Sequence, residues 1–137
     1  MKALDYLEQV DACEIRIENK ISEIQRLEAL ATNISSHLSE VKVSSTPNPL
    51  RIQELWSRLI DARTELMDEV DKLITLKTEV VKTLEMLPLL EYDVLYKIYL
   101  SHYSVQKVAD MKCYTRQAIY DIKDRGIEKL QKILDSR

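Results

Sequence analysis

The side chains best suited to binding chemistry lie in one short segment in the last quarter of the sequence. Arg116, Gln117, Tyr120 and Lys123 follow Thr115 within nine residues. An arginine presents a planar fork of donors that suits guanine edges or phosphate, and a glutamine amide can both donate to and accept from adenine. Tyrosine and lysine side chains commonly contact the sugar-phosphate backbone. Alone, the segment would be an ordinary solvated helix face, but within the frame of residues 104–115 described below it predicts an interface with double-stranded DNA.

The rest of the sequence does not indicate catalysis. The chain has one glycine, so phosphate loops and dinucleotide fingerprints, which need several, are not expected. The acidic residues of the first 90 positions follow helix faces instead of metal-ligand spacing. Cys13 and Cys113 lie a hundred residues apart, without a CxxC motif or a histidine partner, which indicates reduced thiols. We expect a non-enzyme that uses no metal and no cofactor.

The candidate residues belong to a region in which the sequence predicts three short helices. Short helices are predicted over residues 91–103, 105–111 and 116–134. Ser104 can cap the second helix and Thr115 the third, because a hydroxyl oxygen can accept from the free N–H groups of a first turn. Residues 111–114 then form the short turn of a helix-turn-helix motif.

A small core is predicted for this unit, with Ala109 where the two helices of the motif cross closely. The core residues fall on facing sides of the three helices: Val94, Leu95, Ile98, Val105, Val108, Ala109, Ile119, Ile122, Ile127 and Leu130. Six of the seven tyrosines lie between Tyr92 and Tyr120, and packing in the core and at its rim is expected for the first four of them.

About 45 residues of this region closely resemble region 4 of bacterial sigma factors. The resemblance is carried by Val105-Gln106-Lys107-Val108-Ala109-Asp110, Tyr114-Thr115-Arg116-Gln117-Ala118-Ile119, Ile122 and Arg125-Gly126-Ile127-Glu128-Lys129-Leu130, with the helix around Val94-Leu95-Tyr96-Lys97-Ile98-Tyr99 before them. In that family the last helix recognises the promoter −35 element and the region docks on RNA polymerase. The resemblance implies that Arg116 and Gln117 contact bases.

The sequence departs from the family pattern in the turn and on the last helix. Cys113 stands where glycine is usual and must accept the turn geometry at some cost. Lys112 stands where a core leucine is usual, so Met111 is expected to fill the gap. Tyr120 and Asp121 replace polar or basic types, which implies a different target sequence.

Two long helices precede this unit. Apolar residues recur at helical spacing over residues 4–41, and the Ser/Thr-rich and proline-containing residues 42–49 predict a loop. A second helix follows over residues 50–87. Its apolar residues stand seven apart, with further apolar residues on alternate positions of the stripe: Ile52, Leu59, Leu66, Leu73, Val80 and Leu87, with Trp56, Val70 and Leu84.

The pattern predicts an all-α protein with a helical hairpin or coiled coil over residues 1–88 and the helix-turn-helix unit over residues 89–137. Long, narrow apolar stripes leave little core for a monomer, so we expect a homo-oligomer, most simply a dimer. This architecture is similar to the RinA and ArpU type of late transcription regulators that prophages of Gram-positive bacteria encode.

Charge divides unevenly along the sequence. Residues 1–90 hold 11 basic and 16 acidic residues, a net charge of −5, and residues 91–137 hold 9 and 7, a net charge of +2. The second part is thus the better candidate for DNA contact. No apolar run approaches the roughly 18 residues of a membrane span, and a cytoplasmic protein without membrane contact is expected.

Three functions remain open from the sequence. The first is a sequence-specific transcription regulator that oligomerises through its long helices. The second is a module that binds RNA polymerase or a sigma factor without contacting bases. The third is a small terminase-like packaging protein, since such subunits also combine a helix-turn-helix with helical oligomerisation segments, although there the DNA-binding part usually comes first.

Overall fold

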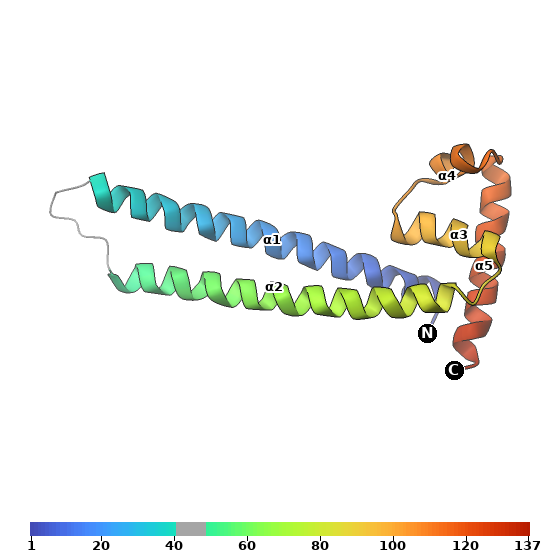
Figure 1. The fold of residues 1–137 in the computed structure, drawn as a ribbon, viewed down its shortest axis with the longest axis horizontal. Helices are drawn as coiled ribbons and strands as arrows, with labels where there is room; N and C mark the ends of the chain where they lie inside the picture. Colours follow the sequence, from blue (N-terminus) through green and yellow to red (C-terminus); the bar gives the residue numbers. More distant parts are fainter. Residues whose placement is uncertain (41–48) are drawn as a thin grey trace. The chain divides into compact units, whose positions relative to one another are not determined.

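The computed structural model describes the backbone of residues 1–40 and 49–137, and the side chains of residues 1–33 and 50–137. The described residues form an all-α fold, as the sequence predicts. The predicted loop falls outside them, apart from Pro49, which opens a helix where its missing N–H costs nothing. The helices (Figure 1) are α1 (Ala3–Glu40), α2 (Pro49–Leu84), α3 (Leu89–Leu95), η1 (Tyr96–Leu100), α4 (Val105–Lys112) and α5 (Arg116–Asp135).

The chain divides into two compact units. The first comprises Met1–Cys13 and Leu73–Arg137, and the second comprises Glu14–Lys72. The start of α1 and the end of α2 thus belong to the same unit as the C-terminal helices. The division into residues 1–88 and 89–137, predicted from the sequence, stays a prediction about domains.

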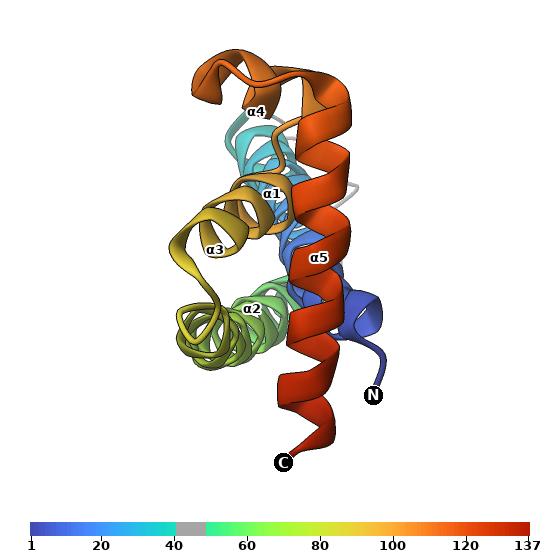
Figure 2. The same cartoon turned by 90° about the vertical axis from the view of Figure 1, so that its right-hand side faces the viewer.

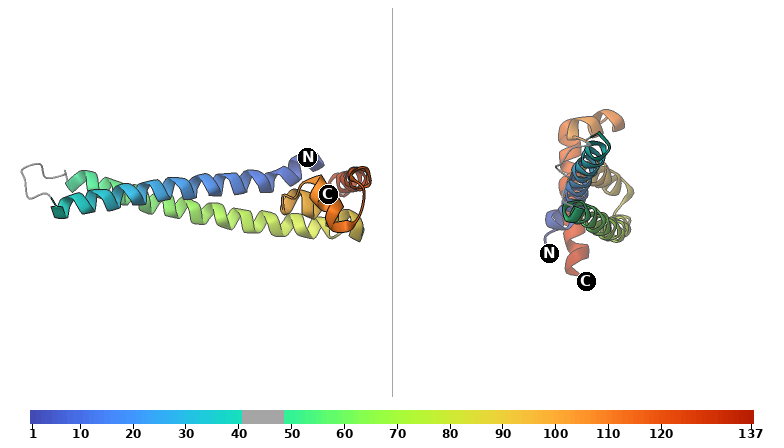
Figure 3. Two further views of the ribbon diagram at one scale, coloured as in Figure 1. Left: turned by 90° about the horizontal axis from the view of Figure 1, so that it is seen from above. Right: turned by 90° about the vertical axis from the view of Figure 1, so that its left-hand side faces the viewer.

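In the second unit, α1 and α2 run side by side, as two views show (Figures 1 and 3). Ile24 of α1 packs with Leu59 and Ala62 of α2, and all three are buried. Two ion pairs flank this contact: Lys20 with Glu65, and Arg63 Nη2 with Glu28 Oε1 at 2.7 Å. These pairs are exposed and contribute little, so the apolar contact is the main source of stability.

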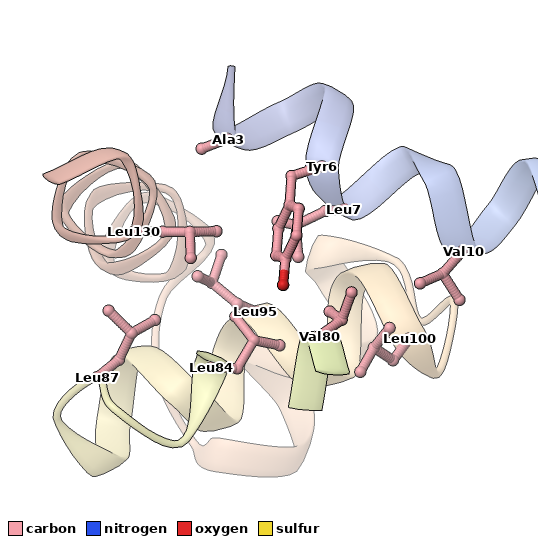
Figure 4. Packing of buried hydrophobic residues seen from close by; sticks show 10 residues of the cluster. All are labelled: Ala3, Tyr6, Leu7, Val10, Val80, Leu84, Leu87, Leu95, Leu100 and Leu130. Carbon is pink, nitrogen blue, oxygen red and sulfur yellow. The ribbon is translucent and has the colours of Figure 1, made fainter. Parts of the chain in front are cut away.

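The first unit is built on a core that combines residues from distant parts of the sequence (Figure 4). Its buried members come from the first turns of α1, the last turns of α2 and the C-terminal helices: Ala3, Tyr6, Leu7, Val10, Val80, Leu84, Leu87, Leu95, Leu100 and Leu130. Full burial of each large apolar side chain contributes about 1.5–3 kcal/mol. This core therefore fixes the C-terminal helices to both long helices within the unit.

Polar contacts join the same elements. The backbone N–H of Ala3 in α1 donates to Gln131 Oε1 in α5 at 2.8 Å. The Tyr6 hydroxyl lies 3.0 Å from Thr83 Oγ1, and Thr83 is almost fully buried in α2. The buried hydroxyls are thus hydrogen-bonded, as burial of polar groups requires.

A second, smaller core lies among the C-terminal helices themselves. Its buried members are Val94, Val108, Ala109, Ile119 and Ile122, with Ile98, Tyr103 and Val105 packed against them. Figure 2 shows α5 running past α3, with α4 near one end of α5. Seven of the ten residues predicted for the core of this region belong to this cluster, with Ile98 and Val105 only partly buried. Leu95, Ile127 and Leu130 belong instead to the larger core with the long helices, so the predicted single core is divided between two clusters.

The single glycine allows α3 and α5 to approach closely. Gly126 is buried in α5, and a Cβ at this position would lie 3.0 Å from Leu95 Cδ1 and 3.4 Å from Glu91 Cβ. Glycine costs about 1 kcal/mol relative to alanine inside a helix. The close contact between the two helices offsets that cost.

The first of the three short helices differs from its prediction. Instead of one α-helix over residues 91–103, the structure has α3 followed by the π-helical turn η1. His102 then adopts a left-handed conformation, with φ 60°. A π turn places one more residue in the turn than an α-helix does, which apolar periodicity cannot reveal.

None of the helices in the described ranges combines the length and the apolar character needed to span a membrane.

Candidate nucleic-acid interface

The candidate interface is built on α4, a short turn and α5. Ser104 precedes α4 in an extended conformation, and its Oγ accepts a hydrogen bond of 3.2 Å from the backbone N–H of Lys107. Thr115 precedes α5 in the same way, and its Oγ1 accepts from the N–H of Ala118 at 3.1 Å. Both predicted caps are confirmed. Each satisfies one of the donors that a helix start leaves free.

The turn contains a left-handed residue at Cys113, the position where the related pattern usually has glycine. This residue has φ 59° and ψ 38°, which closes α4, and the N–H of Tyr114 donates to the carbonyl of Ala109 at 3.0 Å. Any residue with a Cβ adopts this conformation at a cost, usually avoided by glycine. The thiol of Cys113 is exposed, and Cys13 is buried.

Three of the predicted interface residues share the exposed side of the first turns of α5. Arg116 and Gln117 are exposed, and the Tyr120 ring is 39% exposed. The opposite side of the helix packs through Ile119 and Ile122 into the small core. The arrangement leaves a guanidinium, an amide and a phenol available together to a partner.

The Gln117 amide is hydrogen-bonded to a neighbouring carboxylate. Its Nε2 donates to Oδ1 of Asp121 at 3.1 Å, one helical turn further along. Asp121 is exposed and so is Asp124. The pair holds the Gln117 amide in one orientation, and a base would have to compete with Asp121 for its donor.

Lys123 lies at the edge of this face, seven residues after Arg116 and three after Tyr120. It is half-buried, because it also follows the fully buried Ile119 by four residues. Its Nζ lies 5.8 Å from the ring centroid of Tyr120. Burial raises the pKa of the Tyr99 hydroxyl, and the neighbouring ammonium of Lys123 partly offsets this rise.

Asp93 connects α3 to the end of α4. Its carboxylate pairs with Lys97 one turn along and with Lys112 in the last turn of α4. Burial raises the pKa of Asp93, but the hydrogen bonds from the two lysines outweigh burial and leave the pKa below its ordinary value. The ion pair with Asp93 gives Lys112 a structural role at a position where sigma-factor region 4 usually has leucine. Met111, expected to fill the core there, is instead 49% exposed.

Glu91 connects α3 to α5 in a similar way. The carboxylate is buried, and its Oε1 accepts from Nζ of Lys129 at 2.9 Å. The hydrogen bond from Lys129 lowers the pKa of Glu91 in spite of its burial. Acidic residues of α3 thus hold both helices of the motif, which fixes the orientation of the exposed side of α5.

The structure also shows residues around the motif that sequence reasoning did not select. Lys107 is exposed in the first turn of α4, and its Nζ lies 4.6 Å from the ring centroid of Tyr103. Tyr114, in the turn, is 46% exposed. The position of Lys107 three residues after the capping Ser104 was the available signal, since a lysine at a helix start near DNA can contact phosphate.

Comparison of the chain with known protein families, with curated proteins and with solved structures finds no match in any of the three.

Proposed function

We propose that this protein is a sequence-specific DNA-binding transcription regulator, of the kind that phages or prophages encode, which acts in the bacterial cytoplasm. The first turns of α5 enter a major groove, where Arg116 and Gln117 contact base edges and Tyr120 contacts the backbone. Thr115 caps the helix at the groove, and Lys123 contributes positive charge from the side of α5.

The observation that carries the proposal is the capped pair of helices around a left-handed turn. Ser104, Cys113 and Thr115 fix the ends of α4 and α5 by backbone geometry and hydrogen bonds. This is the geometry through which a helix-turn-helix presents the N-terminal residues of its second helix to base edges. The exposed Arg116 and Gln117 occupy those N-terminal positions.

Charge on the reading face argues that one motif binds weakly. The carboxylates of Asp121 and Asp124 lie beyond the base-reading residues and would approach phosphates unfavourably. Two copies on two half-sites would restore affinity, because the second contact becomes intramolecular. The proposal therefore includes self-association through the long helices, with a dimer as the working state.

A second candidate function is supported by the same acidic residues. Asp121 and Asp124 on α5, and Met111 and Tyr114 at the end of α4 and in the turn, are all exposed, and this mixture of acidic and apolar side chains suits a protein surface such as that of RNA polymerase. In this alternative the motif contacts polymerase or a sigma factor and does not read bases.

Selection from random duplex DNA distinguishes these functions. The full-length protein is incubated with a random library, and bound DNA is amplified and sequenced over several rounds. Enrichment of a defined motif, in two half-sites, is the expected result. Salt-sensitive binding without an enriched motif, or no binding, would contradict base reading and favour the polymerase-binding alternative.

A further inference from the structure

Gln131 in α5 shows how this chain uses a glutamine amide to bind a pair of polar groups. Its Nε2 donates to Oδ1 of Asp135 at 2.9 Å, one helical turn further along. The same Nε2 also donates to the carbonyl of Met1 at 3.1 Å, and Oε1 accepts from the backbone N–H of Ala3 at 2.8 Å. Asp135 thus holds one amide hydrogen, while the amide oxygen and the second hydrogen bind a donor and an acceptor at the start of α1.

Gln117 and Asp121 repeat the first half of this arrangement near the other end of α5. They have the same spacing along the helix, and Gln117 Nε2 donates to Oδ1 of Asp121 at 3.1 Å. An ionised carboxylate only accepts hydrogen bonds, so the amide must turn its nitrogen toward Asp121. Asp121 competes with a base for one of the two hydrogens on this nitrogen. The amide oxygen and the second hydrogen of the exposed Gln117 have no partner among the residues that the structure describes.

This remaining edge of the Gln117 amide matches one base. In the major groove, adenine presents its N6 amino group as a donor beside the N7 acceptor, which is the combination that Gln131 binds at Ala3 and Met1. Guanine presents two acceptors, cytosine a donor alone, and thymine an acceptor beside a methyl group. A free glutamine can turn its donors toward guanine, whereas an amide held by Asp121 cannot turn over without breaking that hydrogen bond.

We infer that Asp121 is a positioning residue that determines specificity, because it holds the Gln117 amide in the orientation that reads adenine. The inference rests on the proposed function, since it requires the first turns of α5 to lie in the major groove. The Asp121 carboxylate weakens binding to DNA of any sequence by repelling phosphates, and in return it fixes which base Gln117 accepts. Its removal should therefore raise the affinity for DNA in general and lower the preference for adenine.

Selection from random duplex DNA by full-length variants tests this role. Wild type is expected to enrich adenine about tenfold or more over the other bases at one position of each half-site, and Gln117→Ala should lose this enrichment. Asp121→Ala should lose most of it as well, although it binds DNA more tightly overall. Asp121→Asn removes the same charge but keeps an oxygen that accepts from the Gln117 amide, so it should retain the adenine.

Asp110→Ala is the matched control for these variants. Gln106 and Asp110 form the same pair in α4, where Nε2 of Gln106 lies 2.9 Å from Oδ1 of Asp110, and the control should keep the adenine. An adenine preference that survives Asp121→Ala, or that Asp121→Asn loses as well, would overturn the inference. A wild-type motif without an adenine that depends on Gln117 would also overturn it. In each of these cases the enriched motif leaves the proposed function intact.

Nuclear magnetic resonance of the free full-length protein measures the hydrogen bond without DNA. One of the two side-chain N–H protons of Gln117 is expected to resonate downfield of its position in Asp121→Ala, and Asp121→Asn should retain this shift. The side-chain resonances of Gln131 should be the same in all three proteins. Gln117 resonances that do not differ between wild type and Asp121→Ala would overturn the inference. A wild-type protein that shows the shift but enriches no motif would instead contradict the proposed function, and the reading of adenine with it.

Discussion

The buried carboxylate of Glu91 in α3 accepts a hydrogen bond of 2.9 Å from Lys129 in α5. Two residues further along α3, Asp93 holds Lys112 at the end of α4. Neighbouring acidic residues of one short helix therefore hold both helices of the motif. The first two predictions concern these contacts.

Loss of Lys129 is expected to destabilise the first unit more than loss of the whole pair. Lys129→Met leaves the buried Glu91 carboxylate without its lysine partner, at a cost of about 1–2 kcal/mol, reduced by the partial exposure of the lysine. Adding Glu91→Leu removes the unpaired charge and should recover most of the loss. Urea unfolding followed by circular dichroism measures both variants. A double variant less stable than Lys129→Met would contradict the account.

The pH dependence of stability should reflect Asp93. Its pKa and that of Glu91 are lowered in the folded protein, so below about pH 4 the unfolded chain binds more protons than the folded one. The free energy of unfolding should thus be constant near neutrality and fall as acid is added. Asp93→Asn should be less stable at pH 7 and lose less stability between pH 5 and pH 3. Parallel pH profiles for the two proteins would contradict this role.

The turn residue Cys113 offers a stabilising substitution. Because its φ is 59°, Cys113→Gly removes the cost that a Cβ imposes on a left-handed residue, and a gain of up to about 1 kcal/mol is expected. Cys113→Val should instead lower stability, since β-branched residues tolerate this conformation poorly. Thermal unfolding of the three proteins compares them directly. A lower Tm for the glycine variant would show that the thiol makes a contact that outweighs the strain.

The close approach at Gly126 should limit what can replace it. Gly126→Val is expected to cost about 1–3 kcal/mol, because Leu95 is fully buried and cannot move away. Gly126→Ala is the matched control. Alanine is more favourable than glycine inside a helix by about 1 kcal/mol, but its Cβ would lie 3.0 Å from Leu95 Cδ1. The two effects oppose each other, so the free energy of unfolding should change little. Equal Tm values for the valine variant and the wild type would rule out tight packing here.

Much of the fold could be predicted from the sequence because the signals are local. Both long helices, the caps Ser104 and Thr115, and the left-handed turn at Cys113 depend on residues within one or two turns of each other. The position of Lys112 could not be predicted in this way, because it depends on a carboxylate 19 residues away in α3.

The apolar rows of α2 show another limit. Periodicity finds a row with seven-residue spacing, but it does not say which neighbour covers it. Trp56 was predicted on the same apolar stripe as the buried Leu59, and it is 45% exposed. Ile60 and Met67 have the same seven-residue spacing and are exposed, but they were not selected, since only the position of α1 shows which row remains open.

The central claim is that α5 reads bases through Arg116. The most direct test is a titration of the selected DNA site, and of a scrambled site, with wild type, Arg116→Ala and Lys132→Ala across a salt series. Lys132→Ala is the matched control, because it removes one exposed positive charge near the other end of the same helix. Arg116→Ala should lose about 1–3 kcal/mol on the selected site and most of its preference over the scrambled site, while Lys132→Ala keeps that preference. Equal effects of the two variants, or a preference that survives Arg116→Ala, would contradict base reading by this helix.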